Sequence, residues 1–359
     1  MSNTQDESLI VRTWFEITVN ALNSGASDIH IEAGAHETLV RFRVDGALQI
    51  QSRHPIDLHE RLITRVKILA RLDIAEKRLP QDGRLYIGYQ FTRPDIDCRV
   101  SILPTLHGEK AVVRILPSRA EDLDLEKIGL LPIQLQIFKH SLKQTHGLIL
   151  VTGPTGSGKT RTLYSCLRAL NQSHRNLCSI EDPIEIRLPG VNQVAYHPRA
   201  GLDFPIIIRA LLRQDPDVIM IGEIRDAITA SLAIQAAQTG HLVLSTLHTR
   251  NAHGALTRLK NLGVDDDMIE SCLLSVSSQR LVRKTCQSCH GNPVATAKLC
   301  QKCKGAGALG RIGVHEVFNK TQILEPTVTQ LSMWDAGLEY VRQGIISQEG
   351  LEAEMGALQ

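Results

Sequence analysis

One segment of the chain has the pattern of a phosphate-binding loop. It reads Gly153-Pro154-Thr155-Gly156-Ser157-Gly158-Lys159-Thr160, which matches G-x-x-x-x-G-K-[ST]. The glycines allow backbone N–H groups to turn toward a phosphate. Lys159 would neutralise the β- and γ-phosphates of ATP, and the Thr160 hydroxyl would ligate Mg²⁺. An apolar run precedes the loop and a helix-like run follows it, which favours nucleotide binding over a plain Gly-rich turn.

A carboxylate that could act on water stands at the end of another apolar run. The run 218–221 is followed by Gly222 and Glu223, where P-loop proteins usually place an aspartate that helps to hold Mg²⁺. Glu223 is therefore predicted to activate or orient the attacking water, with Mg²⁺ held through water and Thr160. The alternative interpretation is a simple ion pair between Glu223 and Arg225.

Three further side chains flank apolar runs that could lead to the same site. Glu181 follows the run 177–180, and the carboxyl ends of parallel strands face the phosphate crevice, although an acidic surface turn is the alternative. His241 and His248 bracket the run 242–246. They are predicted either to sense the γ-phosphate or to be hydrogen-bonded core residues.

Four of the eight cysteines are clustered as two C-x-x-C pairs. The pairs are Cys286/Cys289 and Cys300/Cys303, with ten residues between them. Such pairs can bring four thiolates into a tetrahedron around Zn²⁺, and the polar, Lys-rich loop between them favours a structural clamp over catalysis. The loop is shorter than in most zinc ribbons, so redox-active or metal-free thiols are the alternative.

The bulk composition excludes several classes of protein. The 40 basic and 38 acidic residues leave a net charge of +2, which argues against a protein that coats nucleic acid. Aromatic residues make up 4%, so base-stacking platforms are not expected. No apolar run approaches the roughly 20 residues of a membrane span. No secretory signal is visible, and the cysteine cluster suits a reducing compartment, so a cytoplasmic protein is predicted.

The first third of the chain, residues 1–116, is predicted to form a small α+β domain. A helical segment at 14–22 precedes a strand at 27–32. Alternating apolar residues on both sides of Asp45-Gly46 indicate a hairpin. Leucines and valines at helical spacing predict a helix over 58–72. Strands are expected at 85–89, 97–102 and 111–116.

The rest of the chain has the pattern of a larger α/β domain. Residues 117–132 are acidic and bounded by prolines, which is typical of an interdomain linker. From 133 to 359, short apolar runs alternate with helical stretches and predict a mostly parallel sheet with helices on both faces. A Cys-rich subdomain at 284–305 and a polar helical tail from 316 complete it.

Together these motifs resemble the secretion-ATPase superfamily, the motors of type II secretion and type IV pilus assembly. The resemblance starts near residue 24 and covers almost all of the remaining chain. The motifs that carry it follow the family's order: 27–32, 41–46, 80–84, 99–101, 108–110, 113–116, the P-loop, 180–185, 209–226, 239–249, 279–283 and 310–313.

The resemblance implies a fold and an assembly. It implies a RecA-like P-loop NTPase core, a smaller N-terminal α+β domain of PAS-like type and a small zinc clamp. It also implies a ring of six subunits that hydrolyses ATP between the two domains. Arginines of the N-terminal domain would reach the phosphates as fingers. By motif position these are Arg84 and Arg99, with Arg114 as a further candidate. From the residues alone, all three fit solvated strand positions.

The resemblance also implies a task. The expected role is to power pilus or pseudopilus assembly through an inner-membrane platform protein, at the cytoplasmic face of the membrane and without direct nucleic-acid contact. The four cysteines resemble the assembly branch rather than the retraction branch. The short cysteine loop departs from that branch, and the additional N-terminal docking domain of many relatives is not seen. A retraction motor and a RecA-like nucleic-acid translocase are the alternatives.

Overall fold

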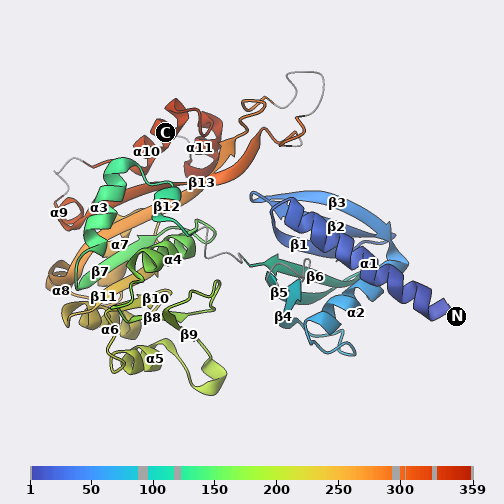
Figure 1. The fold of residues 1–359 in the computed structure, drawn as a ribbon, viewed down its shortest axis with the longest axis horizontal. Coiled ribbons are helices and arrows are strands. Elements are labelled where there is room, and N and C mark those ends of the chain that lie inside the picture. Colours follow the sequence, from blue (N-terminus) through green and yellow to red (C-terminus); the bar gives the residue numbers. More distant parts are fainter. Residues whose placement is uncertain are drawn as a thin grey trace. The chain divides into compact units, whose positions relative to one another are not determined.

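The computed structural model describes residues 2–87, 96–116, 123–292, 300–303, 305–325 and 330–356. The chain divides into two compact units, Met1–Ser118 and Arg119–Gln359 (Figure 1). Each unit has its own hydrophobic core and is described by itself. No helix among the described residues is both long and apolar enough to cross a membrane.

The first unit is an antiparallel sheet of six strands with two helices. The strand order is β3-β2-β1-β6-β5-β4. Its elements are α1 (Ser2–Asn23), β1 (Ala26–Ala33), β2 (Glu37–Val44), β3 (Ala47–Pro55), α2 (His59–Leu69), β4 (Gln81–Ile87), β5 (Ile96–Thr105) and β6 (Gly108–Ile115). The predicted hairpin is present, because Asp45 and Gly46 both adopt positive φ in the turn between β2 and β3. Residues 88 and 89 of one predicted strand lie outside the described residues.

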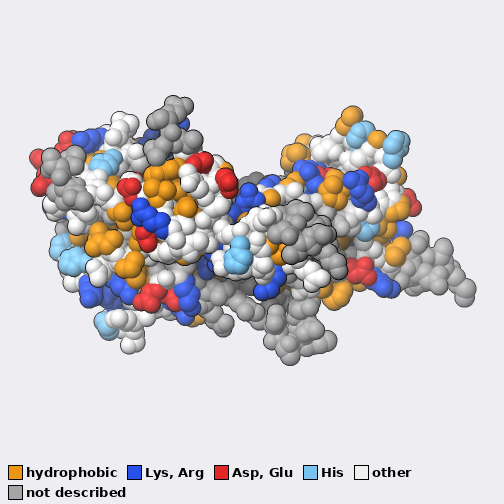
Figure 2. All heavy atoms as spheres, turned by 90° about the horizontal axis from the view of Figure 1, so that it is seen from above, with side chains coloured by type: hydrophobic (Ala, Val, Ile, Leu, Met, Phe, Trp, Pro, Cys, Tyr) orange, Lys and Arg blue, Asp and Glu red, His pale blue; other side chains and the backbone are white. Residues whose placement is uncertain are grey.

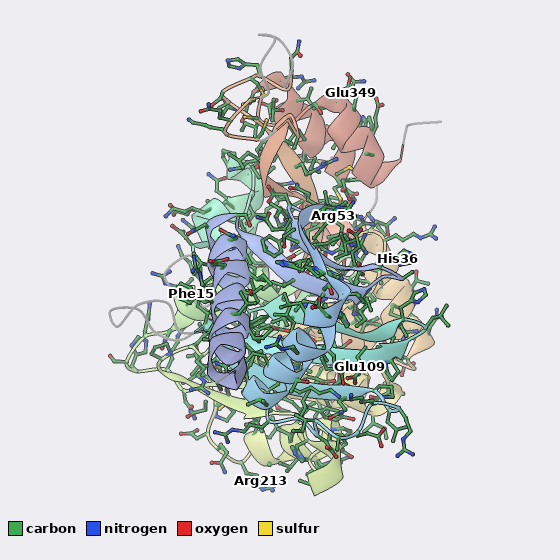
Figure 3. All side chains as sticks on the ribbon, turned by 90° about the vertical axis from the view of Figure 1, so that its right-hand side faces the viewer. Phe15, His36, Arg53, Glu109, Arg213 and Glu349 are labelled. Carbon is green, nitrogen blue, oxygen red and sulfur yellow. The ribbon has the colours of Figure 1, made fainter. Side chains whose placement is uncertain are left out.

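The two helices contribute to a core on one side of this sheet. Trp14 and Ile17 of α1 and Leu62 of α2 belong to one buried cluster with alternate strand residues such as Ile29 and Phe42. In β2 burial alternates with the period of two that a half-buried strand requires, whereas in β1 the four residues 28–31 are all buried. Phe15 is 54% exposed and lies on the outer side of α1 (Figure 3).

The second unit is built on a seven-stranded sheet in the order β13-β12-β7-β11-β10-β8-β9. All neighbouring strands are parallel except β12 and β13. The strands are β7 (Gly147–Thr152), β8 (Leu177–Glu181), β9 (Val191–Ala195), β10 (Val218–Ile221), β11 (Leu242–Leu247), β12 (Leu273–Thr285) and β13 (Ala308–Asn319). The helices are α3 (Pro132–Leu142), α4 (Lys159–Leu170), α5 (Phe204–Leu211), α6 (Ala227–Gln238), α7 (His253–Asn261), α8 (Asp266–Cys272), α9 (Lys320–Leu324), α10 (Met333–Arg342) and α11 (Gln348–Met355).

Two cores lie on opposite faces of this sheet, as the continuous apolar runs predict. Successive residues of β7 divide between them: Leu148 and Leu150 pack with α5, α6 and α8, whereas Ile149 and Val151 pack with α3 and α4. This confirms the predicted α/β class with helices on both faces. Charged side chains of both signs are interspersed on the visible surface, as the near-balanced composition requires (Figure 2).

Two segments differ from the simple pattern expected of them. The first part of the predicted linker, 117–122, lies outside the described residues. The part that follows packs into the second unit, because Leu123, Leu125 and Leu130 are buried in the same core as α3. The prediction of a helical tail from 316 is wrong at its start, because residues 316–319 belong to β13. The helices that follow are also less polar than predicted, since Met333, Tyr340 and other residues of α10 and α11 form a further buried cluster.

Candidate functional site

The phosphate-binding loop connects the carboxyl end of β7 to the first turn of α4. Gly153, Gly156 and Gly158 have φ values of 139°, 81° and 91°. Only glycine adopts such angles without strain, which explains why the motif requires it there. Gly158 directly precedes α4 and caps its N-terminus. The positive end of the helix dipole and unpaired N–H groups of the first turn are thus available to an anion.

The side chain of Lys159 folds back onto the P-loop. It is buried, and its Nζ donates hydrogen bonds of 2.9 Å to the carbonyls of Gly153 and Pro154. Burial lowers the pKa of Lys159, while the nearby carboxylate of Glu223 raises it. Thr160 follows at the start of α4 and is exposed. The loop therefore places a cation and a hydroxyl where a nucleotide's terminal phosphates and Mg²⁺ would need them.

Glu223 lies just beyond the carboxyl end of β10, in the middle of a small charged cluster. Its Oε1 forms an ion pair with Arg225, and its Oε2 lies 3.4 Å from Nε2 of His248. Arg225 also lies 3.7 Å from the carboxylate of Asp182. The ion pair considered as an alternative role for Glu223 is therefore present, and it coexists with a histidine that faces the same carboxylate.

The register of the sheet explains why these groups meet the loop. β11 runs beside β7 with Leu247 opposite Thr152, so His248 and the P-loop leave the sheet at the same edge. Thr246 of β11 also donates a 2.7 Å hydrogen bond to the carbonyl of Gly222, which fixes the residue before Glu223. Burial lowers the pKa of His248, and Lys159 lowers it further.

The structure does not bring His241 to this site. His241 precedes β11, and its carbonyl accepts a hydrogen bond from the N–H of Gly147 at the start of β7. That is the opposite edge of the sheet from the P-loop, roughly 20 Å away along a strand of this length. Its Nδ1 contacts the carbonyl of Ala236 at 3.0 Å, so of the two interpretations the hydrogen-bonded one applies.

Glu181, at the carboxyl end of β8, is hydrogen-bonded to side chains of neighbouring elements. It is only 3% exposed, and its carboxylate accepts hydrogen bonds from Tyr164, Ser179 and Gln193. Tyr164 in turn accepts from the backbone N–H of Glu185. These partners come from α4, β8 and β9, so the hydrogen bonds of Glu181 connect those three elements. The catalytic role of Glu181 stays a prediction. The acid of this segment that reaches the charged cluster is Asp182.

The arginines expected to act as fingers belong to the first unit. Arg84, Arg99 and Arg114 are aligned on β4, β5 and β6, because Arg84 pairs with Arg99 and Arg99 with Arg114 in the register. Arg114 forms a 2.8 Å ion pair with Asp28 of β1. The register of the three strands therefore places Arg84, Arg99 and Arg114 side by side across the sheet. The role of Arg84 and Arg99 toward a phosphate stays a prediction.

The four clustered cysteines do come together, at the end of the β12–β13 ribbon. Their Sγ atoms all lie within 4.8 Å of one another. The Cys286–Cys300 and Cys289–Cys303 distances are 3.9 and 3.6 Å. A tetrahedral Zn²⁺ site with Zn–S bonds of about 2.3 Å requires sulfurs ~3.8 Å apart. A hydrogen bond from the backbone N–H of Ser288 lowers the pKa of Cys286 to about 7, whereas burial and the neighbouring thiols raise the pKa of Cys289 to about 12.

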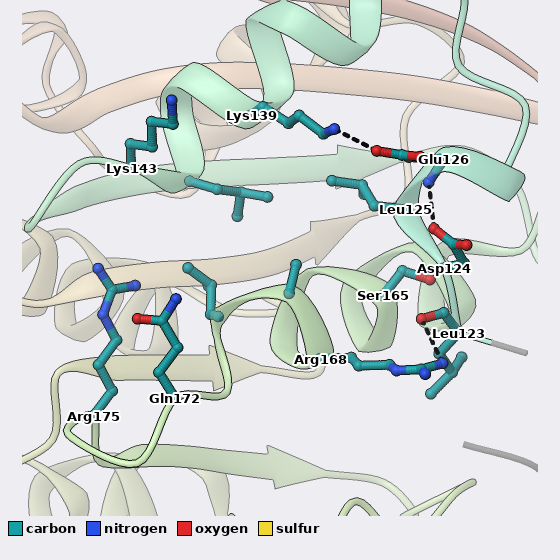
Figure 4. Close-up of a pocket in the computed structure, with 13 residues that line it drawn as sticks. Leu123, Asp124, Leu125, Glu126, Lys139, Lys143, Ser165, Arg168, Gln172 and Arg175 are labelled. Carbon is teal, nitrogen blue, oxygen red and sulfur yellow. Dashed lines mark hydrogen bonds and ion pairs between the residues drawn. The ribbon is translucent and has the colours of Figure 1, made fainter. Parts of the chain in front are cut away.

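A groove of about 540 Å³ lies at the far end of α4, between α4 and α3 (Figure 4). Lys139, Lys143, Arg168 and Arg175 line it, and Lys139 pairs with Glu126 at 2.6 Å. Its centre is displaced from the P-loop by most of a helix, ~14 Å between Lys159 and Arg168. Lys139 and Lys143 lie at the carboxyl end of α3 and Arg168 at that of α4, where a cation is favourable beside the negative end of the helix dipole. The described residues that line this groove do not include any of the P-loop.

Comparison with known proteins agrees with this geometry. A family model described as "Type II/IV secretion system protein" matches residues 3–355. The Type II secretion system protein HxcR of Pseudomonas aeruginosa is 47% identical over 318 residues, covering 88% of this chain and 67% of HxcR. The Type IV pilus assembly ATPase PilB of the same organism is 44% identical, covering 90% of this chain and 61% of PilB.

A solved structure extends the likeness to three dimensions. The pilus retraction motor PilT with bound ADP superimposes with a TM-score of 0.65 at 27% identity, covering 94% of this chain and 96% of that one. The chain spans about two thirds of the length of HxcR and PilB. The resemblance inferred from the motifs is confirmed: the chain belongs to the Type II/IV secretion system protein family and is an ATPase of that family.

Proposed function

We propose that this chain is a motor ATPase that powers the assembly of a type IV pilus or a type II secretion pseudopilus. The observation that carries the proposal is the convergence of Lys159, Glu223 and His248 at one edge of the parallel sheet. Relatives named for type II secretion and for pilus assembly support the choice of task.

The chemistry assigned to the site follows from its charges. The P-loop residues bind the phosphates, and Lys159 leaves its carbonyl partners to neutralise the charge that develops on the γ-phosphate. Glu223 orients the attacking water, and His248 and Arg225 hold the carboxylate in place. Bound Mg²⁺ supplies further charge neutralisation. The Thr160 hydroxyl, exposed at the helix start, is a suitable oxygen ligand for it.

The cysteine cluster suits a structural zinc site. Four thiols at tetrahedral spacing, with no open position for substrate, match the closed coordination of structural zinc. Held by Cys286, Cys289, Cys300 and Cys303, the metal would tie the ends of β12 and β13 together. This feature, through the family resemblance, also favours assembly over the retraction performed by PilT.

The proposal includes a ring of six copies, with Arg84 and Arg99 completing the phosphate environment. It also includes an inner-membrane platform protein as the partner that receives the motion, at the cytoplasmic face of the membrane. The need for more cations supports the arginine fingers, because the P-loop itself provides only Lys159.

The test is ATP turnover by the purified chain with Mg²⁺, alone and with the cytoplasmic part of a platform protein. Turnover that rises with the platform fragment and is lost in Lys159→Ala supports the proposal. Unchanged turnover in Lys159→Ala would overturn the site. Stimulation by single-stranded DNA instead of the platform fragment would replace the task with nucleic-acid translocation.

A further inference from the structure

Gln279 has no role in the chemistry above, yet its side chain reaches from β12 to the P-loop and forms hydrogen bonds there. It is 2% exposed and belongs to the segment 279–283 that precedes the cysteine cluster. In the sheet, β12 pairs with β7, the strand from which the loop emerges, and Ser278 lies opposite Thr152. The next residue along β12 therefore lies beside the start of the loop.

The side-chain amide of Gln279 joins two parts of the nucleotide-binding element. Its Nε2 donates a 2.7 Å hydrogen bond to the carbonyl of Ser157, inside the loop. Its Oε1 accepts a 2.8 Å hydrogen bond from the hydroxyl of Thr162, in the first turn of α4. Both bonds are buried, so neither group can exchange its partner for water without local opening.

The backbone around Gln279 is equally close to the loop. A Cβ on Gly153 would come within 2.6 Å of the Gln279 carbonyl oxygen, and one on Gly158 within 3.2 Å of its Nε2. Gly153 and Gly158 are the first and last glycines of the motif. Gln279 therefore contacts the loop near both ends, and its presence is one reason why these two positions accept no side chain.

We propose that Gln279 is a positioning residue that holds the phosphate-binding loop in its nucleotide-accepting shape. By holding the Ser157 carbonyl, Gln279 restrains the peptide that carries the N–H of Gly158, one of the groups at the start of α4. By accepting from Thr162, it ties the same loop to the helix that carries Lys159 and Thr160. The inference rests on the proposed binding of ATP at this loop.

The chain offers a matched control in Gln134. That residue is 1% exposed, and its amide also donates to a carbonyl, that of His315, while accepting from the N–H of Leu131. It lies in α3 and makes neither of the P-loop contacts described for Gln279. Replacing either glutamine by methionine removes one buried donor and one buried acceptor at similar volume. The two variants should therefore lose comparable stability for the same physical reason.

The experiment compares Gln279→Met and Gln134→Met with the wild-type chain. ATP affinity is measured with a fluorescent ATP analogue, KM and kcat from ATP turnover, and stability from thermal unfolding. We expect Gln279→Met to raise Kd and KM by on the order of tenfold, the effect of ~1.4 kcal/mol, while kcat falls less. Gln134→Met should shift the unfolding temperature without changing Kd.

A second pair of variants keeps the test decisive if Gln279→Met does not fold. Thr162→Val removes only the hydroxyl that Gln279 accepts from, and Thr162→Ser keeps it. Thr162→Val should weaken ATP binding several-fold, and Thr162→Ser should restore it. Equal affinities in these two variants, or a Gln279→Met variant that binds as tightly as Gln134→Met, would overturn the inference. A wild-type chain that binds no ATP would instead contradict the proposed function.

Discussion

At the scale of single residues, the carboxylate of Glu223 lies between an arginine and a histidine. Arg225 pairs with Glu223, and His248 approaches the other oxygen of the same carboxylate. A carboxylate held at both oxygens keeps one orientation, which a water-orienting group requires. The adjacent Lys159 is buried and shares this electrostatic environment, so binding of phosphate changes the surroundings of all three side chains.

Replacing Glu223 by Gln should separate binding from turnover. The amide keeps the size of the side chain but loses the charge that orients or activates water, so kcat should fall about 100-fold or more while ATP affinity changes little. Steady-state turnover and equilibrium binding of an ATP analogue measure the two quantities. Glu270→Gln, at an exposed position of α8, serves as the control. Near-normal kcat in Glu223→Gln would remove Glu223 from the mechanism.

His315 should make the stability of the second unit depend on pH. Burial lowers the pKa of His315 to about 4, from about 6.5 when unfolded, and its Nε2 lies 3.2 Å from the Ile128 carbonyl. As the pH falls, the imidazole of His315 is therefore protonated in the unfolded state before it is protonated in the folded state. The contribution of neutral His315 to the free energy of unfolding is fully present above pH 6.5. It decreases by about 3 kcal/mol as the pH falls toward 4.

Denaturant unfolding of wild type and His315→Gln between pH 4 and 7.5 measures this contribution. The glutamine can still donate to the Ile128 carbonyl but does not titrate in this range. The stability of the wild type relative to His315→Gln should therefore decrease as the pH falls from 6.5 toward 4. Parallel curves for the two proteins would show that His315 does not carry the dependence.

At the scale of elements, α4 connects three features of the second unit. It starts at the P-loop, its middle contributes Tyr164 to the buried network around Glu181, and its end borders the groove lined by Arg168. The network fixes α4 against β8 and β9. The helix that presents Lys159 is thus anchored along its length and not only by the loop.

Tyr164→Phe should destabilise the second unit by about 1–3 kcal/mol. The change removes the donor to Glu181 and leaves the backbone N–H of Glu185 without its acceptor. Chemical denaturation followed by circular dichroism gives the free energy of unfolding. Tyr196→Phe, where the ring packs against Phe204, provides the comparison and should cost much less. An equal effect in both variants would contradict the assigned network.

Elements and motifs were more predictable than the directions of individual side chains. Short apolar runs and the P-loop pattern have local causes, so the parallel sheet and its loop follow from the sequence. His241 illustrates a signal that was available: it precedes a parallel strand, whereas only residues that follow such a strand reach the P-loop edge. The hydrogen bond between Tyr164 and Glu181 had no local signal, because Tyr164 lies 17 positions earlier and meets Glu181 only through tertiary packing.

At the scale of the whole molecule, the chain is two units, and the residues predicted to act on ATP are divided between them. The second unit carries the P-loop and Glu223, and the first carries the arginines aligned across β4, β5 and β6. If Arg84 and Arg99 act on the phosphates as proposed, turnover requires residues from both units.

Replacing either of the two predicted finger arginines should strongly reduce ATP turnover while nucleotide binding is retained. Arginine fingers contribute factors of about 10³–10⁵ to phosphoryl transfer, so Arg84→Ala and Arg99→Ala should lower kcat by at least ~100-fold. Arg53→Ala, on β3 of the same unit and paired with Glu37, is the control. Assembly state is followed by light scattering, and a variant that assembles and turns over normally would exclude its arginine.

Zinc removal should destabilise the end of the β12–β13 ribbon, where the four cysteines lie. Metal analysis of the purified chain should give about one zinc per chain, and Cys303→Ser should abolish it. Chelation should lower the unfolding temperature of the wild type, because metal binding contributes directly to folding. Cys166→Ser, at a buried cysteine outside the cluster, separates the loss of metal from the loss of a thiol. A chain that contains no zinc when prepared in its presence would contradict the site.

The cysteine cluster also determines where the chain can change in length. Thr285 pairs with Ala308 at the end of the ribbon, and the cysteines follow immediately. If a bound metal holds the four cysteines together, residues inserted between Cys289 and Cys300 do not change the register of β12 against β13. The sheet then keeps every residue of β12 in place beside the P-loop. We therefore expect that a chain with an affinity tag or a fluorescent label inserted between Cys289 and Cys300 retains its ATP turnover.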